Sequence, residues 1–277
     1  MGNLKVGIQL YSLRDKMEAD MYGTLKAVKE MGYDCVEFAG YFGKTAEEIR
    51  AMLDELGLEC VSVHQAPALF DEQGVEAVEF VKKLGAKYAA IPHYNVKRYH
   101  ENWDETMEFF TKIGKLLKDN GVEMLYHNHD FEFETKDGEF IIDKIYSTIS
   151  PELLNPEFDV CWVKYAGQSP EEYLAKYADR LNIVHIKDFW AESFASGPVY
   201  ELIDDKGKVE DKKEEKTEKR TFEFRPVGHG VQDIPSILKA VEKTNAHTII
   251  VEQDQWYEGD NLECAKKSRE YLKSIGY

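Results

Sequence analysis

Cysteine is scarce in this sequence and widely scattered. The 277 residues contain four cysteines, and no two of them form a C-x-x-C pair. A zinc ribbon or a disulfide framework would need closely paired or regularly spaced cysteines, so the pattern favours neither. Most of these cysteines lie in or beside apolar runs, and we therefore expect buried free thiols. The four are Cys35, Cys60, Cys161 and Cys264.

Positive charge is also in short supply. The chain has 35 Lys and Arg against 52 Asp and Glu, which gives a net charge of -17. Proteins that bind nucleic acid neutralise phosphates with a basic surface, so this composition argues against a nucleic-acid partner. A small-molecule substrate remains compatible with it, because a locally positive site can lie on an acidic protein.

Long apolar runs are missing as well. No stretch approaches the roughly 18 consecutive apolar residues of a membrane helix. The opening MGNLKVGIQL enters an apolar strand-like run directly, without the charged leader, apolar region and cleavage site of a signal peptide. We therefore expect a cytoplasmic protein that has no membrane partner.

Eight short β-like runs recur along the chain instead. Most are rich in Val, Ile, Leu and Tyr, as expected for strands that are covered on both faces. The runs are Lys5–Tyr11, Cys35–Phe38, Glu59–His64, Tyr88–His93, Glu123–His129, Asn155–Cys161, Asn182–Asp188 and His247–Asp254.

Segments with helical spacing separate these runs. Thr45 with Glu48 is typical of a capping box, and Ser169 before Pro170 is a typical helix start. Strand and helix repeated eight times predict an α/β protein with a single (β/α)₈ TIM barrel over residues 1–277. An open doubly wound sheet is the alternative, but no G-x-G-x-x-G follows the first strand to support it.

A charged tract interrupts this rhythm after the seventh strand. Residues 190–225 separate that strand from its expected helix and contain DDKGKVEDKKEEKTEKR. Such a tract predicts a solvated loop or exposed hairpin. Because it follows a barrel strand, we expect it on the catalytic face. It would be either a lid or a contact in a homo-oligomer there, and the sequence leaves this choice open.

Polar residues gather where the predicted strands end, which is where barrel enzymes of this kind place their active sites. Five of the eight histidines are among them, and so many buried imidazoles are better explained by one shared site than by separate core positions. The residues are Gln9, Glu37, His64, His93, His127, His129, Asp159, His185 and Glu252.

Three of these residues come from successive strands and form a mixed oxygen and nitrogen set. They are Asp159, His185 and Glu252. Mixed histidine and carboxylate ligands suit Mn²⁺, Zn²⁺, Co²⁺ or Fe²⁺ better than Ca²⁺. The sequence therefore predicts a divalent-metal site.

Several motifs give the chain a resemblance to the sugar phosphate isomerase/epimerase superfamily of xylose isomerase-like TIM barrels. They are GIQLYSLRD, GYDCVEFAG, YHNHDFEF, HIKD and VEQD. That superfamily includes inosose dehydratases and ketose 3-epimerases. The resemblance covers nearly the whole chain apart from the charged tract, and HIKD and VEQ are its more specific parts.

The resemblance implies a metal held by a Glu, an Asp, a His and a Glu from the fifth to eighth strands. Asp159, His185 and Glu252 match the last three. On the fifth strand, His127 stands where the family has a glutamate that is also catalytic in epimerases, and Glu132 is the alternative fourth ligand. Mn²⁺ is the first expectation, with Zn²⁺, Co²⁺, Fe²⁺ or Mg²⁺ as alternatives.

The expected catalytic groups surround this metal. His127 or His129 would be ligand or base, Glu252 would ligate and shuttle a proton, and Lys187 would contact substrate oxygens. Tyr11 and Trp256 could offer apolar faces to a sugar, as Trp162 could. The substrate-binding expectation covers Gln9, Glu37, His64, His93, Trp162, Asp188 and His229.

The function expected from these features is metal-dependent isomerisation or epimerisation of a keto-sugar or related polyol through an enediolate. The alternative is a lyase or dehydratase that expels a β-leaving group from a keto-inositol or 3-keto-glycoside. A non-catalytic sugar-binding barrel is the further alternative. A phosphodiester-cleaving barrel of the same superfamily is disfavoured, because its DNA-facing surface would be basic.

Overall fold

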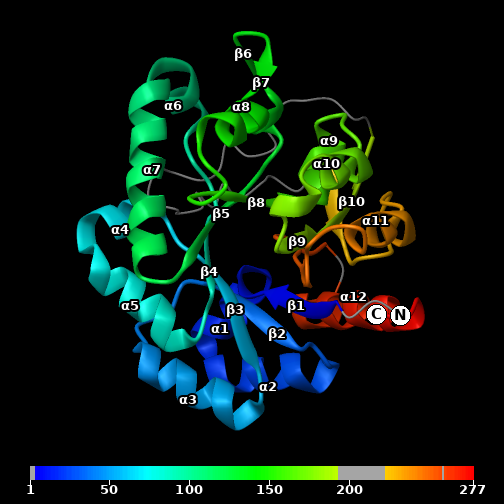
Figure 1. Cartoon of the computed structure of the whole chain (residues 1–277). Helices are drawn as coiled ribbons and strands as arrows, with labels where there is room; N and C mark the ends of the chain where they lie inside the picture. Colours follow the sequence, from blue (N-terminus) through cyan, green and yellow to red (C-terminus); the bar gives the residue numbers. More distant parts are fainter. Residues whose placement is uncertain (1–3, 193–221, 258) are drawn as a thin grey trace, which may run out of the picture.

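Eight parallel strands close into a barrel in the computed structural model, which describes residues 4–192, 222–257 and 259–277 (Figure 1). The order around the barrel is β1-β12-β9-β8-β5-β4-β3-β2, so the last barrel strand pairs with the first. The predicted TIM barrel is therefore confirmed. The strands are β1 (Lys5–Gln9), β2 (Cys35–Ala39), β3 (Glu59–His64), β4 (Tyr88–Ile91), β5 (Glu123–His127), β8 (Asn155–Asp159), β9 (Ile183–Ile186) and β12 (Thr248–Val251).

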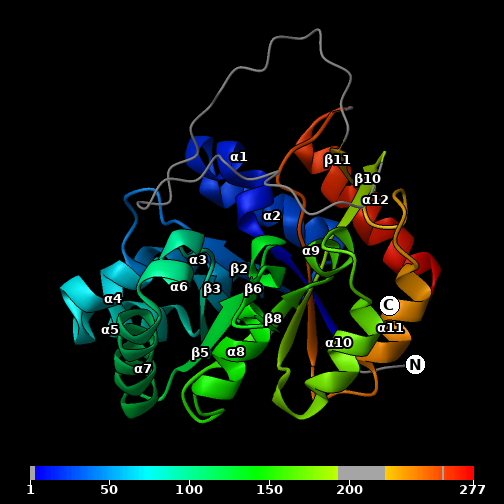
Figure 2. The same cartoon turned by 90° about the horizontal axis from the view of Figure 1, so that it is seen from above.

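Helices surround the barrel on its outer side (Figures 1 and 2). They are α1 (Arg14–Ala19), α2 (Met21–Met31), α3 (Ala46–Leu56), α4 (Pro67–Gln73), α5 (Val75–Leu84), α6 (Val96–Glu101), α7 (Trp103–Asp119), α8 (Ile141–Thr148), α9 (Val160–Tyr165), α10 (Pro170–Lys176), α11 (Ile234–Val241) and α12 (Asn261–Ser274). Short 3₁₀ turns are η1 (Leu10–Leu13), η2 (Phe131–Phe133) and η3 (Ala178–Arg180).

The helix ends form as the local sequence predicts. Thr45 and Glu48 make a complete capping box at the start of α3, and Ser169 caps α10 with Pro170 in its first turn. Gly57 ends α3 in the left-handed conformation with φ of 62°. The apolar faces of these helices pack on the outer side of the barrel, where the largest buried hydrophobic cluster lies.

Several strands end earlier than the sequence pattern predicts. β1 ends at Gln9 rather than Tyr11, which lies in η1, and β5 ends at His127 rather than His129. Glu252 follows β12, which ends at Val251. The polar residues after these strand ends lie outside the hydrogen-bonded ladder, because the chain turns there toward the next helix.

The barrel interior has two layers of different chemistry. Its apolar layer, here called the barrel floor, is a separate cluster of buried residues: Cys35, Val61, Tyr88, Ala90, Leu125, Ile183 and Ile250. Side chains two residues apart on a strand point to the same face. Four buried polar residues each lie two positions after a floor residue in the sequence: Glu37, His127, His185 and Glu252. Together with the buried polar side chains that contact them, they form what we call the polar layer.

The two ends of the charged tract pair with each other in an antiparallel ribbon. β10 (Asp188–Ala191) and β11 (Phe222–Arg225) are antiparallel, and a second small ribbon joins β6 (Thr135–Lys136) to β7 (Glu139–Phe140). The rest of the tract, with DDKGKVEDKKEEKTEKR, lies outside the described residues. Its predicted place on the catalytic face therefore stays a prediction.

Two expectations about composition can be compared with the structure. The four cysteines are all buried, as predicted, and none of these described residues is in a disulfide. Within the described part of the chain, every helix is too short or too polar to cross a membrane.

Candidate metal centre and active-site cavity

Four polar-layer side chains converge at the carboxyl ends of β5, β8, β9 and β12. We call His127, Asp159, His185 and Glu252 the outer cluster; their nearest ligand atoms all lie within 4.8 Å of one another. His127 Nε2 lies 3.4 Å from Asp159 Oδ2 and 3.5 Å from Glu252 Oε2, and His185 Nδ1 lies 3.0 Å from Glu252 Oε2. Tetrahedral ligands bound at 2.0–2.1 Å lie about 3.3 Å apart, so these separations match a metal site.

The outer cluster also contains buried polar atoms that lack hydrogen bonds. Among the described residues, neither ring nitrogen of His127 makes a hydrogen bond, and Asp159 Oδ2 makes none apart from its ion pair with Lys187. Buried polar atoms nearly always have partners, and an exception calls for an explanation such as a bound ion. With two imidazole nitrogens and two carboxylates, the set fits a divalent transition metal.

Lys187 lies against the cavity side of this cluster. Its Nζ is 3.0 Å from Asp159 Oδ2, from Glu252 Oε2 and from Asp254 Oδ2, although the side chain is only 1% exposed. Burial alone would raise the pKa of Glu252, but Lys187 and the neighbouring histidines bring that pKa well below its usual range. Burial alone would also raise the pKa of Asp159, but Lys187 and His127 lower it, so both Asp159 and Glu252 are held as carboxylates.

A second group of four buried side chains lies beneath the first and shares His185 with it. We call Glu37, His64, Glu157 and His185 the inner cluster. Glu37 Oε1 is 2.8 Å from His185 Nε2 and 3.0 Å from His64 Nε2, and Glu157 Oε2 is 2.9 Å from His64 Nε2. His185 therefore turns Nε2 to the inner cluster and Nδ1 to the outer one. Such a carboxylate partner fixes the tautomer and orientation of a ligating histidine.

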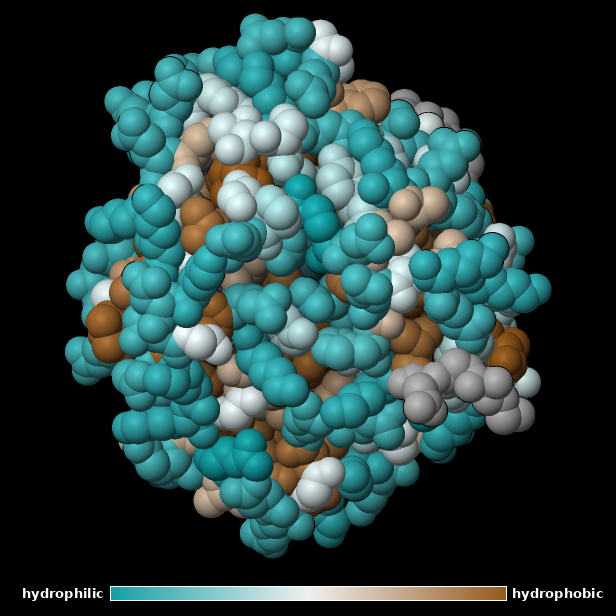
Figure 3. All heavy atoms as spheres, in the orientation of Figure 1, coloured by the Kyte–Doolittle hydropathy of each residue, from teal (hydrophilic) through white to brown (hydrophobic). Residues whose placement is uncertain are grey.

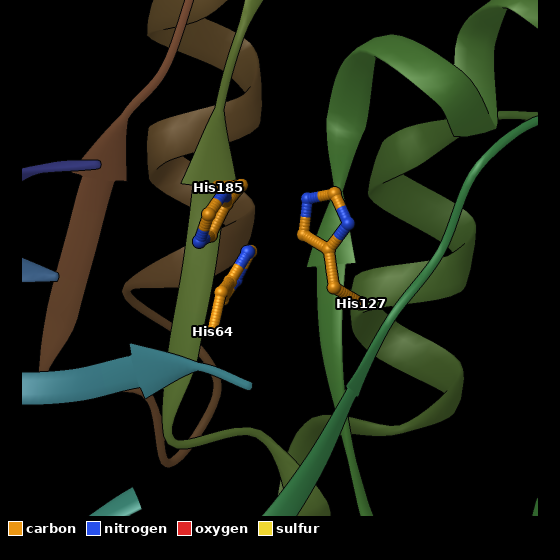
Figure 4. Close-up of side chains that lie close together, drawn as sticks. All are labelled: His64, His127 and His185. Carbon is orange, nitrogen blue, oxygen red and sulfur yellow. The ribbon is translucent and has the colours of Figure 1, made fainter. Parts of the chain in front are cut away.

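The three histidines of the two clusters come from three different strands. Figure 4 shows His64 on β3, His127 on β5 and His185 on β9, with their rings turned toward one another. The ring centroids of His127 and His185 are 4.6 Å apart, and those of His64 and His185 are 5.2 Å apart. Burial alone would lower the pKa of His64, but Glu37 and Glu157 raise it to about 10. The buried carboxylates of the inner cluster are thus paired with imidazole rings.

Sequence reasoning missed Glu157, which lies two residues before Asp159 on β8. Both residues are fully buried, and their carboxylates contact His64 and His127, respectively. The signal was the alternation in NPEFD, which places Glu157 and Asp159 on one face of the strand. Asp254 was missed in the same way, two residues after Glu252 in VEQD, and it contacts Lys187.

Glu132 lies apart from both clusters. Its Oε1 accepts a hydrogen bond from Tyr126 Oη at 2.6 Å, and its Oε2 accepts one from the backbone N–H of His129 at 2.7 Å. Burial raises the pKa of Glu132 to about 8. Of the two candidates for the fourth ligand, the structure brings His127 to the outer cluster and uses Glu132 to fix the turn after β5.

A cavity of about 690 Å³ opens above the outer cluster. Its polar end is lined by His64, His127, Lys187, Glu252 and Asp254. Tyr11, His93 and His129 also line it. The face seen in Figure 3 is mainly hydrophilic, with hydrophobic side chains visible chiefly in its recesses.

Two predicted substrate-binding residues lie below this cavity and are not part of its lining. Gln9 Nε2 donates to Glu37 Oε1 at 2.7 Å, and both side chains are fully buried. Glu37 is thereby engaged by Gln9 and by the two histidines of the inner cluster. These two residues support His185 in the structure, and their contact with substrate stays a prediction.

Three other predicted substrate-binding residues also lie off the lining of the cavity. Trp162 is buried, with its ring stacked 5.8 Å from that of Phe222. The carboxylate of Asp188 accepts backbone N–H bonds from four residues and anchors the turn before α11; the donors are Phe189, Gly228, Gly230 and Gln232. His229 is exposed in that turn and lies near Tyr271.

The sequence matches a family model described as "Xylose isomerase-like TIM barrel" over residues 25–275. Among curated proteins it is 25% identical over 261 residues to an inosose dehydratase of Geobacillus kaustophilus, covering 83% of this chain and 79% of that protein. It is 30% identical over 220 residues to an inosose dehydratase of Clostridium perfringens, covering 72% of this chain and 68% of that protein.

Solved structures show the same fold at lower identity. One is a sugar phosphate isomerase/epimerase of Parabacteroides distasonis, with a TM-score of 0.76 and 22% identity; the match covers 100% of this chain and 96% of that one. Another, described as the IOLI protein with a binding zinc atom, has a TM-score of 0.65 and 14% identity, with 98% of each chain covered.

Proposed function

The chain belongs to the xylose isomerase-like TIM barrel family, and from that premise we propose that it is a divalent-metal-dependent enzyme that enolises a keto-sugar or keto-polyol. The observation that carries this proposal is the outer cluster, a buried set of two imidazoles and two carboxylates at the polar end of a cavity. A pocket that combines such a cluster with a few converging polar groups is the kind of site in which enzymes act on small molecules.

The outer cluster supplies the proposed ligands, His127, Asp159, His185 and Glu252. A divalent ion supplies Lewis-acid polarisation of a carbonyl group when it is bound. Beneath this set, Glu37 holds His185 by Nε2, so that Nδ1 is the nitrogen presented to the site. The chain's own contribution is therefore a fixed and deeply buried set of donor atoms.

Proton transfer falls to the residues between the outer cluster and the cavity. Glu252 is held as a carboxylate and lines the cavity, so it can accept a proton from the carbon next to a substrate carbonyl. Lys187 Nζ lies 3.0 Å from Glu252 Oε2 and also lines the cavity, where it can donate to a substrate oxygen. His129 lines the same wall and is the second candidate base.

Elimination is the outcome that this arrangement favours. An epimerase with two catalytic glutamates would need a carboxylate at the position of His127, and Glu132, the nearest substitute, is engaged by Tyr126 and His129. The similar curated proteins are named inosose dehydratases, which supports the same assignment. Isomerisation is the second candidate, and the name of the Parabacteroides distasonis structure favours it.

Deuterium exchange tests the shared step. The protein loaded with Mn²⁺ is incubated in D₂O with keto-sugars, keto-inositols and 3-keto-glycosides, and the products are identified by NMR. We expect deuterium at the carbon next to the carbonyl, together with an unsaturated product if elimination follows. The Asp159→Ala variant is the control and should lose both the exchange and the bound metal. No exchange with any of the three substrate classes would overturn the proposal.

A further inference from the structure

The cavity extends well beyond the outer cluster. Its far part, here called the apolar arm, is lined by the loop after β3, the start of α4, the loop after β4 and one face of α7. The side chains that give this arm its character are Ala66, Pro67, Ala68, Pro92, Tyr94 and Phe109. Tyr94 and Phe109 are half-buried, and their ring centroids lie 6.2 Å apart. The arm thus offers ring faces and small apolar groups, in contrast to the polar end.

The outer rim of the arm is polar. Arg98 and Glu105 are exposed there, while Thr106 is 2% exposed and lies deeper. Among the described residues that line the arm, charged side chains therefore lie at its outer rim alone. This arrangement suits a ligand that is apolar in its middle and reaches solvent at its end.

A single sugar ring does not match the whole cavity. Pockets of roughly 300–1,000 Å³ take drug-sized ligands, and this cavity, at about 690 Å³, lies in that range. A monosaccharide carries a polar group on nearly every carbon, so it gains little from a wall of Pro, Ala, Tyr and Phe. The polar end provides enough hydrogen-bonding groups for one ring, which leaves the arm for something less polar.

We propose that the apolar arm is a subsite for the apolar aglycone of a keto-glycoside whose sugar ring lies at the polar end. This inference rests on the proposed function and names its substrate class. The continuity of the two parts in one cavity is the reason for joining the sugar and the apolar group by a glycosidic bond. The group in the arm is then the leaving group of the elimination.

The corresponding reaction balances without an oxidant or reductant. A base of the site removes the proton on the carbon between the carbonyl and the anomeric carbon. The electron pair forms a carbon–carbon double bond, and the anomeric carbon–oxygen bond breaks with its electrons on the aglycone oxygen. That oxygen takes up one proton, so the products are an unsaturated keto-sugar and the free alcohol or phenol.

A pair of substrates with the same sugar ring tests the subsite. We compare kcat/KM for a phenyl 3-keto-glucoside with that for the methyl 3-keto-glucoside on the Mn²⁺-loaded protein. Binding of a phenyl-sized apolar group is worth roughly tenfold to 100-fold, so we expect a preference of at least about tenfold for the phenyl compound. Equal values for the two compounds would overturn the subsite, and so would a preference for a 3-keto-disaccharide over the phenyl compound.

A variant that fills the arm provides the second test. Ala68 is exposed on α4 and lines the arm, so Ala68→Trp should fill it without disturbing the core. We expect the phenyl-to-methyl ratio of kcat/KM to fall toward one. Gln73→Trp is the matched control, because Gln73 is exposed on the same helix and is not part of the lining, and it should leave the ratio unchanged. A ratio that survives Ala68→Trp contradicts the proposal.

Calorimetry with an unreactive ligand separates this inference from the proposed function. Phenyl glucoside, which has no carbonyl, should bind more tightly than methyl glucoside, and Ala68→Trp should abolish the difference. If it binds in this way while no keto-substrate exchanges deuterium, the proposed function fails and the subsite stands. If exchange occurs and the two glucosides bind alike, the subsite fails and the proposed function stands.

Discussion

The barrel floor and the polar layer are built by the same strands and differ in almost every physical respect. On β9 the step from Ile183 to His185 crosses from one to the other, and at the end of β12 the step from Ile250 to Glu252 does the same. The floor gains stability from apolar burial, which needs no partner. The polar layer holds carboxylates and imidazoles out of water, which is costly unless each is paired. The barrel floor thus stabilises the fold, whereas the polar layer lowers its stability and provides the site.

Removing a ligand from the polar layer should have the largest effect. His185→Ala deletes the one residue shared by the outer and inner clusters. We expect loss of the bound metal and a fall in activity of roughly 1,000-fold or more, measured by elemental analysis and by substrate turnover. His247→Ala is the control, since His247 lies at the opposite end of the barrel beside Tyr88 of the floor. Full metal content in His185→Ala would contradict the site.

Truncating a floor residue should give the reverse pattern. Ile250 is completely buried in the floor, so Ile250→Ala should lower the free energy of unfolding by about 2–5 kcal/mol through cavity formation. The metal-to-protein ratio of the folded protein should stay the same. Urea unfolding and elemental analysis check the two parts. Ile250→Val, expected to cost about 0.5–1.5 kcal/mol, is the graded control. Loss of metal with little loss of stability would show that the two layers are not separable.

A substitution beneath the metal ligands should have an intermediate effect. Glu37→Gln keeps the size of the side chain but weakens the contact that fixes His185. Loss of such a supporting contact typically lowers metal affinity by about 10- to 100-fold. Competition with a chelator of known affinity measures this change. Glu59→Gln, at a half-exposed carboxylate at the start of β3, should leave metal affinity as it is. An unchanged affinity in Glu37→Gln would mean that the inner cluster does not support the ligand.

The smallest effect should come from a buried carboxyl group outside the polar layer. The pKa of Glu132 is raised by burial from 4.5 to about 8, so between these pH values the folded protein keeps a proton that the unfolded chain releases. Stability therefore falls as pH rises through this interval, by up to about 1.4 kcal/mol per pH unit.

Urea unfolding at pH 6 and pH 7 checks this contribution. Glu132→Gln cannot titrate at that position, so its stability should fall less between the two pH values than that of the parent protein. Equal pH dependence in the two proteins would contradict the assignment. Glu252 differs from Glu132 in this respect, because nearby cationic groups lower the pKa of Glu252.

The closed barrel could be predicted from the sequence because eight apolar runs and the helix-start signals between them pointed to the same fold. Asp159, His185 and Glu252 could be placed together for a topological reason, since the ends of parallel strands meet at one face. The prediction could not decide between His127 and Glu132. That choice depends on how the turn after β5 folds, and Glu132 is drawn into it by two hydrogen bonds.

Other features of the site depend on contacts between distant segments. Gln9 ends β1 and Glu37 lies in the middle of β2. The two side chains pair with each other below the cavity, where Glu37 also contacts His185. The apolar arm had no signal at the strand ends, because Ala68 and Phe109 belong to helices. Only the packing of α4 and α7 over the loop after β4 brings these side chains beside the polar end.

The pairing of β1 with β12 has a consequence for how the protein is made. A chain leaving the ribosome presents β1 first, and some 240 residues must follow before its partner emerges, so both flanks of the unfinished sheet stay open during most of synthesis. Glu252 arrives with this last strand. A truncated or stalled product would thus lack both the final seam of the barrel and one proposed ligand, and metal uptake in a translation reaction would report the moment of closure.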